Sequence, residues 1–451
     1  MRVVTYIIIL LLNLNPLLSQ KLIFSTSNLD TSAILFTSIE GEKAFVVDSI
    51  YPNEKKQIII ETNKYFLHHG FYQIIFHDNK RIIFIYDRKD IDIQADNQSI
   101  DESPKVIKSQ TNQLYFQFLR LTKSYKDKSE LLHHILDNYP KADDYYDITL
   151  RTLARIQSTY LEFVNKTSQM NKKSFIARYI RSARLPVIDG QLSAEERGKM
   201  LRKHSLDNVD FADPELIFSD VFTNKSIEYL SYYRNPHFPK DLLEKEFMKA
   251  VEILLEKAKR DHLIYQHITE YFIEGFRKFG FDHVIDYIIE NYIIKDDLCL
   301  NESLSGSLER RIEHARLFKP GNTVPNIVMS DASGSPVELN RLNTDIILIL
   351  FYASWCTHCQ SLLPRINNLY KNQEVLKTEV FAISLDTVKS EWLDFVRDND
   401  LSWINVSDLK GWDGISASDY FIYATPTMIL IDNQYKIISK PLSVEELKDW
   451  F

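Results

Sequence analysis

The stretch Trp355-Cys356-Thr357-His358-Cys359 constrains this chain most, because it holds two thiols two residues apart directly after an apolar run. That run, Asp345 to Tyr352, is short, almost uniformly apolar and rich in β-branched residues, which predicts a central parallel strand buried on both faces. The segment from Gln360 to Tyr370 predicts a helix. Cys356 would then lie at a strand-to-helix turn, near free backbone N–H groups and the positive end of the helix dipole, which favour its thiolate.

Two structural readings compete with redox chemistry for this cysteine pair: a structural disulfide and half of a zinc site. A zinc site needs a second pair of ligands, and the adjacent pairs His68-His69 and His133-His134 have no thiol near them in the sequence. A disulfide that spans two residues removes little entropy from the unfolded chain, so it stabilises poorly. We therefore predict a redox couple that uses no metal and no cofactor.

Residues 1 to 20 have the pattern of a secretory signal peptide: Arg2, an apolar run from Val3 to Leu12 and a polar end at Ser19-Gln20. An uncleaved membrane anchor is the alternative, because further leucines lengthen the run. The pattern predicts export to the periplasm or cell envelope. The net charge of −8 argues against a nucleic-acid partner.

The sequence holds only 3 cysteines, a low count that is also common among exported bacterial proteins in general. Thiols tend to be oxidised after export, so a protein with this count is not built on disulfides and is predicted to handle those of other proteins. Cys299 is flanked by leucines, which favours a buried, inert thiol over a resolving cysteine.

The length of 451 residues predicts several domains. Short β-branched and aromatic runs predict a β-rich, β-sandwich-like accessory domain over residues 21–105. Apolar residues spaced three and four apart predict an all-α accessory domain over residues 106–318. Alternating strands and helices predict an α/β domain over residues 319–451, with a parallel core, an antiparallel hairpin and a closing helix from Val444 to Phe451. The predicted helices of the middle domain are Gln110–Asn138, Asp143–Met170, Ser174–Arg184, Pro214–Arg234, Asp241–Gly280, Asp282–Ile293 and Ser307–Leu317.

Several short segments of the C-terminal part match the pattern of a known family: Pro320-Gly321, Val324-Pro325, Phe351 to Cys356 with Cys359, Pro364, Ser384-Leu385-Asp386 and Thr425-Pro426-Thr427. On these segments, residues 319–451 resemble the exported thiol-disulfide oxidoreductases of the TlpA/ResA group, which implies a thioredoxin-like fold. Residues 21–318 more weakly resemble the accessory domains that precede such modules in exported proteins of some Gram-negative bacteria.

The resemblance also implies roles for single residues. Cys356 would be the nucleophile and Cys359 the resolving cysteine, and together they would form the redox-active disulfide. Pro426 would be a cis-proline that leaves the backbone of Thr425 free to pair with an extended substrate, with Trp355 as an apolar wall beside the sulfur.

His358 is predicted to modulate the acidity of Cys356 if its ring lies near that sulfur, and the alternative is an exposed histidine with little effect. Two positions depart from the family pattern. Leu362 stands where some cytochrome-maturation members carry glutamate, and Leu350 stands where thioredoxins carry a buried aspartate. These departures count against a dedicated cytochrome c maturation role and leave water or His358 as the proton acceptor for Cys359.

The leading hypothesis is an exported thiol-disulfide oxidoreductase that acts on protein thiols and disulfides, as a reductant supplied by a membrane electron donor. One alternative is a peroxiredoxin-like thiol peroxidase, which shares the hairpin that opens the C-terminal domain. The other is an envelope binding or interaction protein, in which residues 21–318 recognise a partner. The sequence leaves the oligomeric state and the direction of electron flow open.

Overall fold

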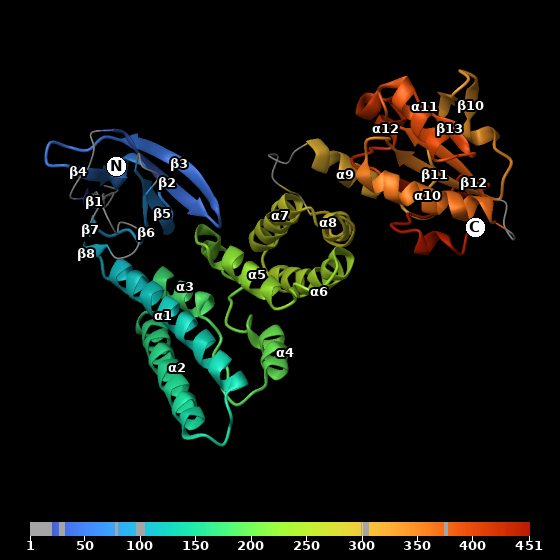
Figure 1. Ribbon diagram of the computed structural model, residues 1–451. Helices are drawn as coiled ribbons and strands as arrows, with labels where there is room; N and C mark the ends of the chain where they lie inside the picture. Colours follow the sequence, from blue (N-terminus) through green and yellow to red (C-terminus); the bar gives the residue numbers. More distant parts are fainter. Residues whose placement is uncertain are drawn as a thin grey trace, which may run out of the picture. The chain divides into compact units, whose positions relative to one another are not determined.

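The computed structural model describes residues 20–26, 32–76, 80–95, 104–298, 300, 306–373 and 378–451. They belong to two compact units, Met1–Phe279 and Gly280–Phe451 (Figure 1). The predicted signal peptide, apart from Gln20, and Cys299 lie outside the described residues. Within the described ranges, no helix is both long and apolar enough to cross a membrane.

The first unit opens with two four-stranded sheets, ordered β4-β1-β7-β8 and β3-β2-β5-β6. Aromatic side chains of both sheets meet: the rings of Phe24 and Phe84 lie 4.7 Å apart, and each is fully buried. These aromatic residues are therefore core residues, which is the role expected of alternating buried positions in strands. The strands are β1 (Lys21–Thr26), β2 (Ile34–Glu40), β3 (Lys43–Ile50), β4 (Gln57–Glu61), β5 (Gly70–Ile75), β6 (Arg81–Tyr86), β7 (Ile91–Ala95) and β8 (Lys105–Lys108).

Helices make up the rest of the first unit. In α2 the buried residues Tyr146, Thr149, Leu153 and Tyr160 follow helical spacing, so one face of the helix packs inward. In contrast, α4 buries none of its residues. The helices are α1 (Gln110–Asn138), α2 (Asp144–Met170), α3 (Phe175–Ala183), α4 (Ala194–His204), η2 (Pro214–Phe218), α5 (Val221–Ser231), α6 (Lys240–Ala258) and α7 (His262–Phe279).

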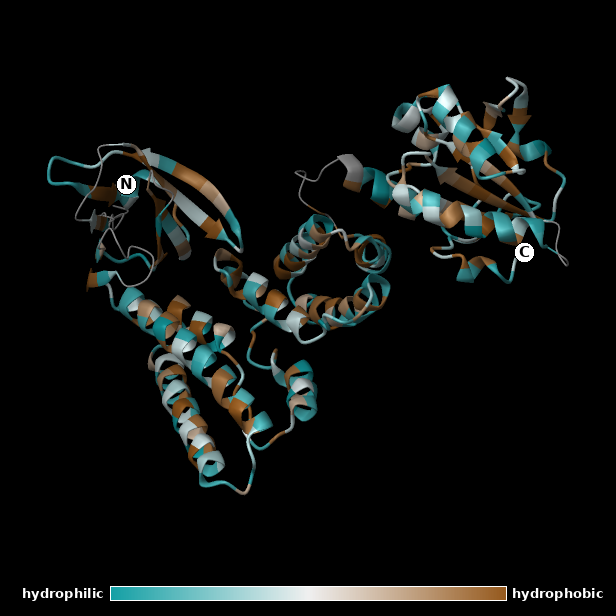
Figure 2. Cartoon of the chain, in the orientation of Figure 1, coloured by the Kyte–Doolittle hydropathy of each residue, from teal (hydrophilic) through white to brown (hydrophobic). Residues whose placement is uncertain are grey.

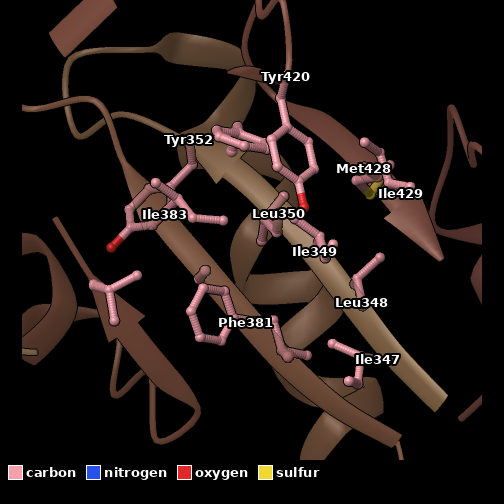
Figure 3. Packing of buried hydrophobic residues seen from close by; sticks show 14 of the residues in the cluster. Ile347, Leu348, Ile349, Leu350, Tyr352, Phe381, Ile383, Tyr420, Met428 and Ile429 are labelled. Carbon is pink, nitrogen blue, oxygen red and sulfur yellow. The ribbon is translucent and has the colours of Figure 1, made fainter. Parts of the chain in front are cut away.

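The second unit contains a five-stranded sheet ordered β13-β12-β11-β14-β15. Strand β11 pairs in parallel with β12 and antiparallel with β14, and Ile347 to Tyr352 are fully buried (Figure 3). This arrangement confirms the predicted thioredoxin-like fold. The elements are β9 (Val328–Ser330), β10 (Pro336–Glu338), η4 (Leu339–Arg341), β11 (Ile346–Tyr352), α10 (Thr357–Lys371), β12 (Thr378–Ser384), α11 (Lys389–Asp398), β13 (Ile404–Val406), η5 (Gly411–Asp413), α12 (Ile415–Asp419), β14 (Thr427–Asp432), β15 (Ile437–Ser439) and η6 (Glu445–Leu447).

Three further helical segments precede the sheet in the same unit: α8 (Asp282–Ile288), the π-helical turn η3 (Ile289–Ile294) and α9 (Gly306–Leu317). The three-domain division with boundaries after residues 105 and 318 stays a prediction. The predicted closing helix over Val444–Phe451 is wrong, because only η6 forms there.

The sheet sets the position of the cysteine turn. Strand β11 ends at Tyr352 and α10 begins at Thr357, so the cysteine pair follows the carboxyl end of the central strand. Phe351 lies opposite Thr427, the first residue of the antiparallel β14. The segment before β14 therefore meets the cysteine turn. Figure 2 shows hydrophobic residues along the strands of this sheet and both polar and apolar residues along α10.

Candidate active site

Cys356 is the N-cap residue of α10. The backbone N–H of Cys359 donates a hydrogen bond to Cys356 Sγ at 3.2 Å. The sulfur takes the place of the side-chain oxygen with which Ser or Asp commonly caps a helix. The sulfur thus lies where the partial positive charge of the helix end and a backbone donor act on any negative charge it carries.

The two thiols differ in their surroundings. Both are free cysteines in the structure; Cys356 is 7% exposed, whereas Cys359 is fully buried. Burial, together with the hydrogen bond to Cys356, raises the pKa of the Cys359 thiol far above its ordinary value. Cys359 is therefore held as a thiol until a reaction at Cys356 changes its surroundings.

The loop before β14 completes the sulfur's environment. The Thr425–Pro426 peptide bond is cis, and the thiol of Cys356 donates a hydrogen bond to the carbonyl oxygen of Thr425 at 3.3 Å. Four of the residues singled out from the sequence, Cys356, Cys359, Thr425 and Pro426, therefore come together. Their chemical roles stay predictions.

A buried carboxylate, Asp386, holds the turn in front of the cysteines. The sequence placed Asp386 in a segment that matches the family but predicted no role for it. Its oxygens accept hydrogen bonds from Ser354 N–H at 3.1 Å, Ser354 Oγ at 2.6 Å and Ser384 Oγ at 2.7 Å. Asp386 is fully buried. The available signal was an acidic residue just after a buried parallel strand, where the carboxyl ends of the strands meet.

Trp355 and a second tryptophan form an apolar surface beside the cysteine turn. Trp355 is 52% exposed, and its ring centroid lies 6.3 Å from that of Trp412 in η5. Trp412 was not singled out from the sequence, because the short segment that carries it has no periodic pattern.

His358 is exposed in the first turn of α10, where its carbonyl oxygen accepts a hydrogen bond from Ser361 Oγ at 2.9 Å. Its predicted influence on Cys356 stays a prediction. Leu350 is fully buried in β11, and Leu362 packs against the same core. The two positions noted in the sequence therefore lie in or against the hydrophobic core.

No group of three or more His, Cys, Asp or Glu side chains within the described ranges is arranged to hold a metal ion. The two thiols of this arrangement can take part in thiol–disulfide exchange.

Comparisons with known proteins match the C-terminal part of the chain. The model of the AhpC/TSA family matches residues 320–440. Thiol-disulfide oxidoreductase ResA of Bacillus cereus is 30% identical over 120 residues, which cover 27% of this chain and 68% of the relative. ResA of Halalkalibacterium halodurans is 29% identical over 122 residues, with the same coverage of 27% and 68%.

Two solved structures are also similar. A thiol-disulfide oxidoreductase from Bacteroides fragilis has 26% sequence identity and a TM-score of 0.26, and the match covers 29% of this chain and 100% of that one. A thioredoxin-like protein from Bacteroides caccae has 23% identity and a TM-score of 0.38, with 59% and 96% covered.

The sheet order and the family match define the C-terminal part as a thioredoxin-like domain, and the protein as a thiol-disulfide oxidoreductase. With 30% identity to a ResA protein over 68% of its length, the chain belongs to the ResA/TlpA-like family.

Proposed function

We propose that this oxidoreductase reduces protein disulfides outside the cytoplasm through the couple Cys356/Cys359. The observation that supports it most is the position of Cys356 Sγ, at the start of α10 and 3.3 Å from the carbonyl oxygen of Thr425. A sulfur in that position can be reached by a substrate segment that runs along the loop.

The reaction proceeds by two exchanges. The Cys356 thiolate attacks one sulfur of the substrate disulfide, a mixed disulfide forms, and the other substrate sulfur leaves as a thiolate that takes up a proton. Cys359 then loses its proton and attacks Cys356, which releases the second substrate thiol and forms the Cys356–Cys359 disulfide. Two electrons and two protons pass to the substrate. The burial of Cys359 supports this order, because a protonated thiol does not compete for the first attack.

Backbone pairing and apolar contact would bind the substrate. Thr425 and Pro426 are half-buried beside the sulfur, so an extended peptide could pair with the Thr425 backbone as an added strand. Trp355, half of whose surface is exposed, would contact its apolar side chains. His358 would favour the thiolate of Cys356 if its ring lies near that sulfur.

Export and the electron supply are part of the proposal. The segment 1–20 supports export to the periplasm or cell envelope, with an uncleaved anchor as the alternative. Each turnover leaves the couple oxidised, so a reductant must restore it, and a membrane electron donor is the class that fits this location. We also propose that residues 21–105 form a β-sandwich-like accessory domain and residues 106–318 an α-helical one.

The test is dithiol-dependent reduction of insulin by the purified protein. We expect catalytic precipitation of insulin by the wild type and none by Cys356→Ser or Cys359→Ser, because each variant lacks one of the two exchanges. Equal rates for wild type and Cys356→Ser would overturn the proposal. Rapid consumption of peroxide by a Cys359→Ser variant would instead support the peroxiredoxin-like alternative.

A further inference from the structure

The helices α8 and α9 contact the thioredoxin-like domain at the segment that leads into the loop of Thr425 and Pro426, called the substrate loop below. This segment, Tyr420 to Tyr423, ends one residue before Ala424 and two before Thr425. The helices lie in the part of the chain that precedes residue 319, where the resemblance to known oxidoreductases begins.

A buried charged group joins the two helices to this segment. Arg311 of α9 is 8% exposed, and its Nε donates a hydrogen bond to Asp286 Oδ1 of α8 at 2.6 Å. The hydroxyl of Tyr423 donates to the same carboxylate oxygen at 2.9 Å. The guanidinium carbon of Arg311 lies 4.7 Å from the centre of the Tyr423 ring. Tyr423 is therefore held by a hydrogen bond and by a cation–π contact at once.

A second contact holds the other end of the segment. Nδ1 of His314 in α9 donates a hydrogen bond to the carbonyl oxygen of Tyr420 at 2.8 Å. The ring of Phe318 stacks on His314 and lies 4.9 Å from the ring of Tyr420. His314, Phe318 and Tyr420 are all buried, so this end of the segment has little freedom to shift.

The held segment leads straight to the sulfur. Only Ala424 separates Tyr423 from Thr425, so a displacement of Tyr423 reaches the Thr425 carbonyl through two peptide units of nearly fixed geometry. On its far side the loop is fixed by β14, where Thr427 lies opposite Phe351. The position of the Thr425 carbonyl relative to Cys356 Sγ therefore depends on contacts at Tyr423.

We propose that Arg311 and Asp286 are positioning residues for disulfide exchange, which act through Tyr423 on the substrate-binding loop. The inference rests on the proposed function, because it assigns to that loop the binding of an extended protein substrate. It makes helices α8 and α9 a working part of the redox site. The guanidinium of Arg311 is buried, whereas Asp286 is only partly buried. A buried charge is costly unless its partner keeps its geometry, so loss of Arg311 or of Asp286 displaces the other and Tyr423 with it.

The test uses Arg311→Met in the full chain, with Arg178→Met as the matched control. Arg178 of the first unit is likewise paired with a carboxylate, that of Asp213, at 2.6 Å, and its guanidinium carbon lies 5.8 Å from the centre of the Phe175 ring. Two reactions are compared: insulin, which would use the Thr425 loop, and the small aromatic disulfide DTNB, which needs only the sulfur. Hydrogen exchange of the residues around Thr425 is measured as well.

We expect kcat/KM for insulin to fall about tenfold in Arg311→Met, mainly through KM, because a small misplacement of a binding loop has an effect of this size. The DTNB rate should stay within about twofold of wild type, and the loop should exchange faster. Arg178→Met should match wild type in the kcat/KM for insulin, the DTNB rate and the hydrogen exchange of the loop. An unchanged loop exchange, or an equal loss with insulin and DTNB, would overturn the inference.

Failure of the proposed function and failure of the positioning role of Arg311 give different results. If wild type fails to reduce insulin, the proposed function fails, while the hydrogen exchange of the loop still decides whether Arg311 positions it. If Arg311→Met does not fold, Tyr423→Phe decides, since it removes only the hydroxyl that Asp286 accepts from. Tyr423→Phe should raise loop exchange and KM for insulin, and wild-type values in both would overturn the inference.

Discussion

Asp386 shows how one side chain fixes the geometry of the cysteine turn. Its carboxylate is fully buried, yet it has partners for its oxygens in Ser354 and Ser384. A buried carboxylate without such donors would be unfavourable by several kcal/mol. The backbone N–H of Ser354 is therefore tied to the neighbouring strand end, two residues before Cys356.

Replacing Asp386 by alanine removes the acceptor and leaves the N–H and hydroxyl of Ser354 without a partner. We expect unfolding free energy to fall by about 3 kcal/mol and insulin reduction to fall about tenfold. Denaturant unfolding and turnover measure both. Asp331→Ala is the control, since Asp331 accepts similar bonds from Ser333 and Ser335 in an exposed hairpin turn. Equal effects of both variants would contradict this role of Asp386.

His314 gives the second unit a pH-dependent stability. Burial, which penalises the charged ring, lowers its pKa from 6.5 to about 4; Lys440 lowers it further, while the Tyr420 carbonyl, Asp286 and Glu290 act in the opposite direction. The unfolded chain therefore takes up a proton at a pH where the folded chain does not. The contribution of His314 to stability is complete above pH 6.5 and is lost as the pH falls toward 4.

We expect the second unit to lose about 2 kcal/mol between pH 7.5 and pH 5 through His314 alone, and His314→Gln to lack this loss. Glutamine can still donate to the Tyr420 carbonyl but does not titrate. All 5 tryptophans lie in the second unit, so tryptophan fluorescence during denaturation reports that unit alone. The same pH dependence in His314→Gln and wild type would contradict the assignment.

Elements with a dense apolar pattern were predictable, and elements held by other contacts were not. The run before the cysteines predicted β11, which is buried along almost its whole length. Helix α4 was missed because none of its residues is buried, so no apolar period marks it; its only signal is the capping box of Ser193 and Glu196. The predicted closing helix fails because the chain end bonds elsewhere: Trp450 O accepts from Thr378 Oγ1 of β12.

Because α4 has no buried face, its stability depends on its cap. We expect Ser193→Ala to weaken α4 by about 1 kcal/mol, seen as roughly fivefold faster hydrogen exchange in that helix. Ser174→Ala is the control. Ser174 caps α3, a helix with one buried face that includes Phe175 and Ile180. Exchange in α3 should change less, because packing holds that helix. Equal fraying of both helices would contradict the argument.

In the molecule as a whole, the sequence predicted the residues of the C-terminal site but not the contacts that α8 and α9 make beside it. The cysteine pair, Thr425 and Pro426 came from a motif, and the structure brings them together. The bond between Asp286 and Tyr423 joins residues 137 positions apart. No local pattern in the sequence encodes such a contact, because it depends on how α8 and α9 pack within the second unit.

In the proposed reaction, Cys356 attacks a protein disulfide and Cys359 resolves the mixed disulfide. Acid quenching of Cys359→Ser during its reaction with insulin, followed by mass spectrometry, locates the trapped mixed disulfide. We expect insulin to be linked to Cys356, and we expect Cys356→Ser to trap none because Cys359 is buried. A link to Cys359 in Cys356→Ser, or no link to Cys356 while its thiol still reacts with DTNB, would contradict the proposed reaction.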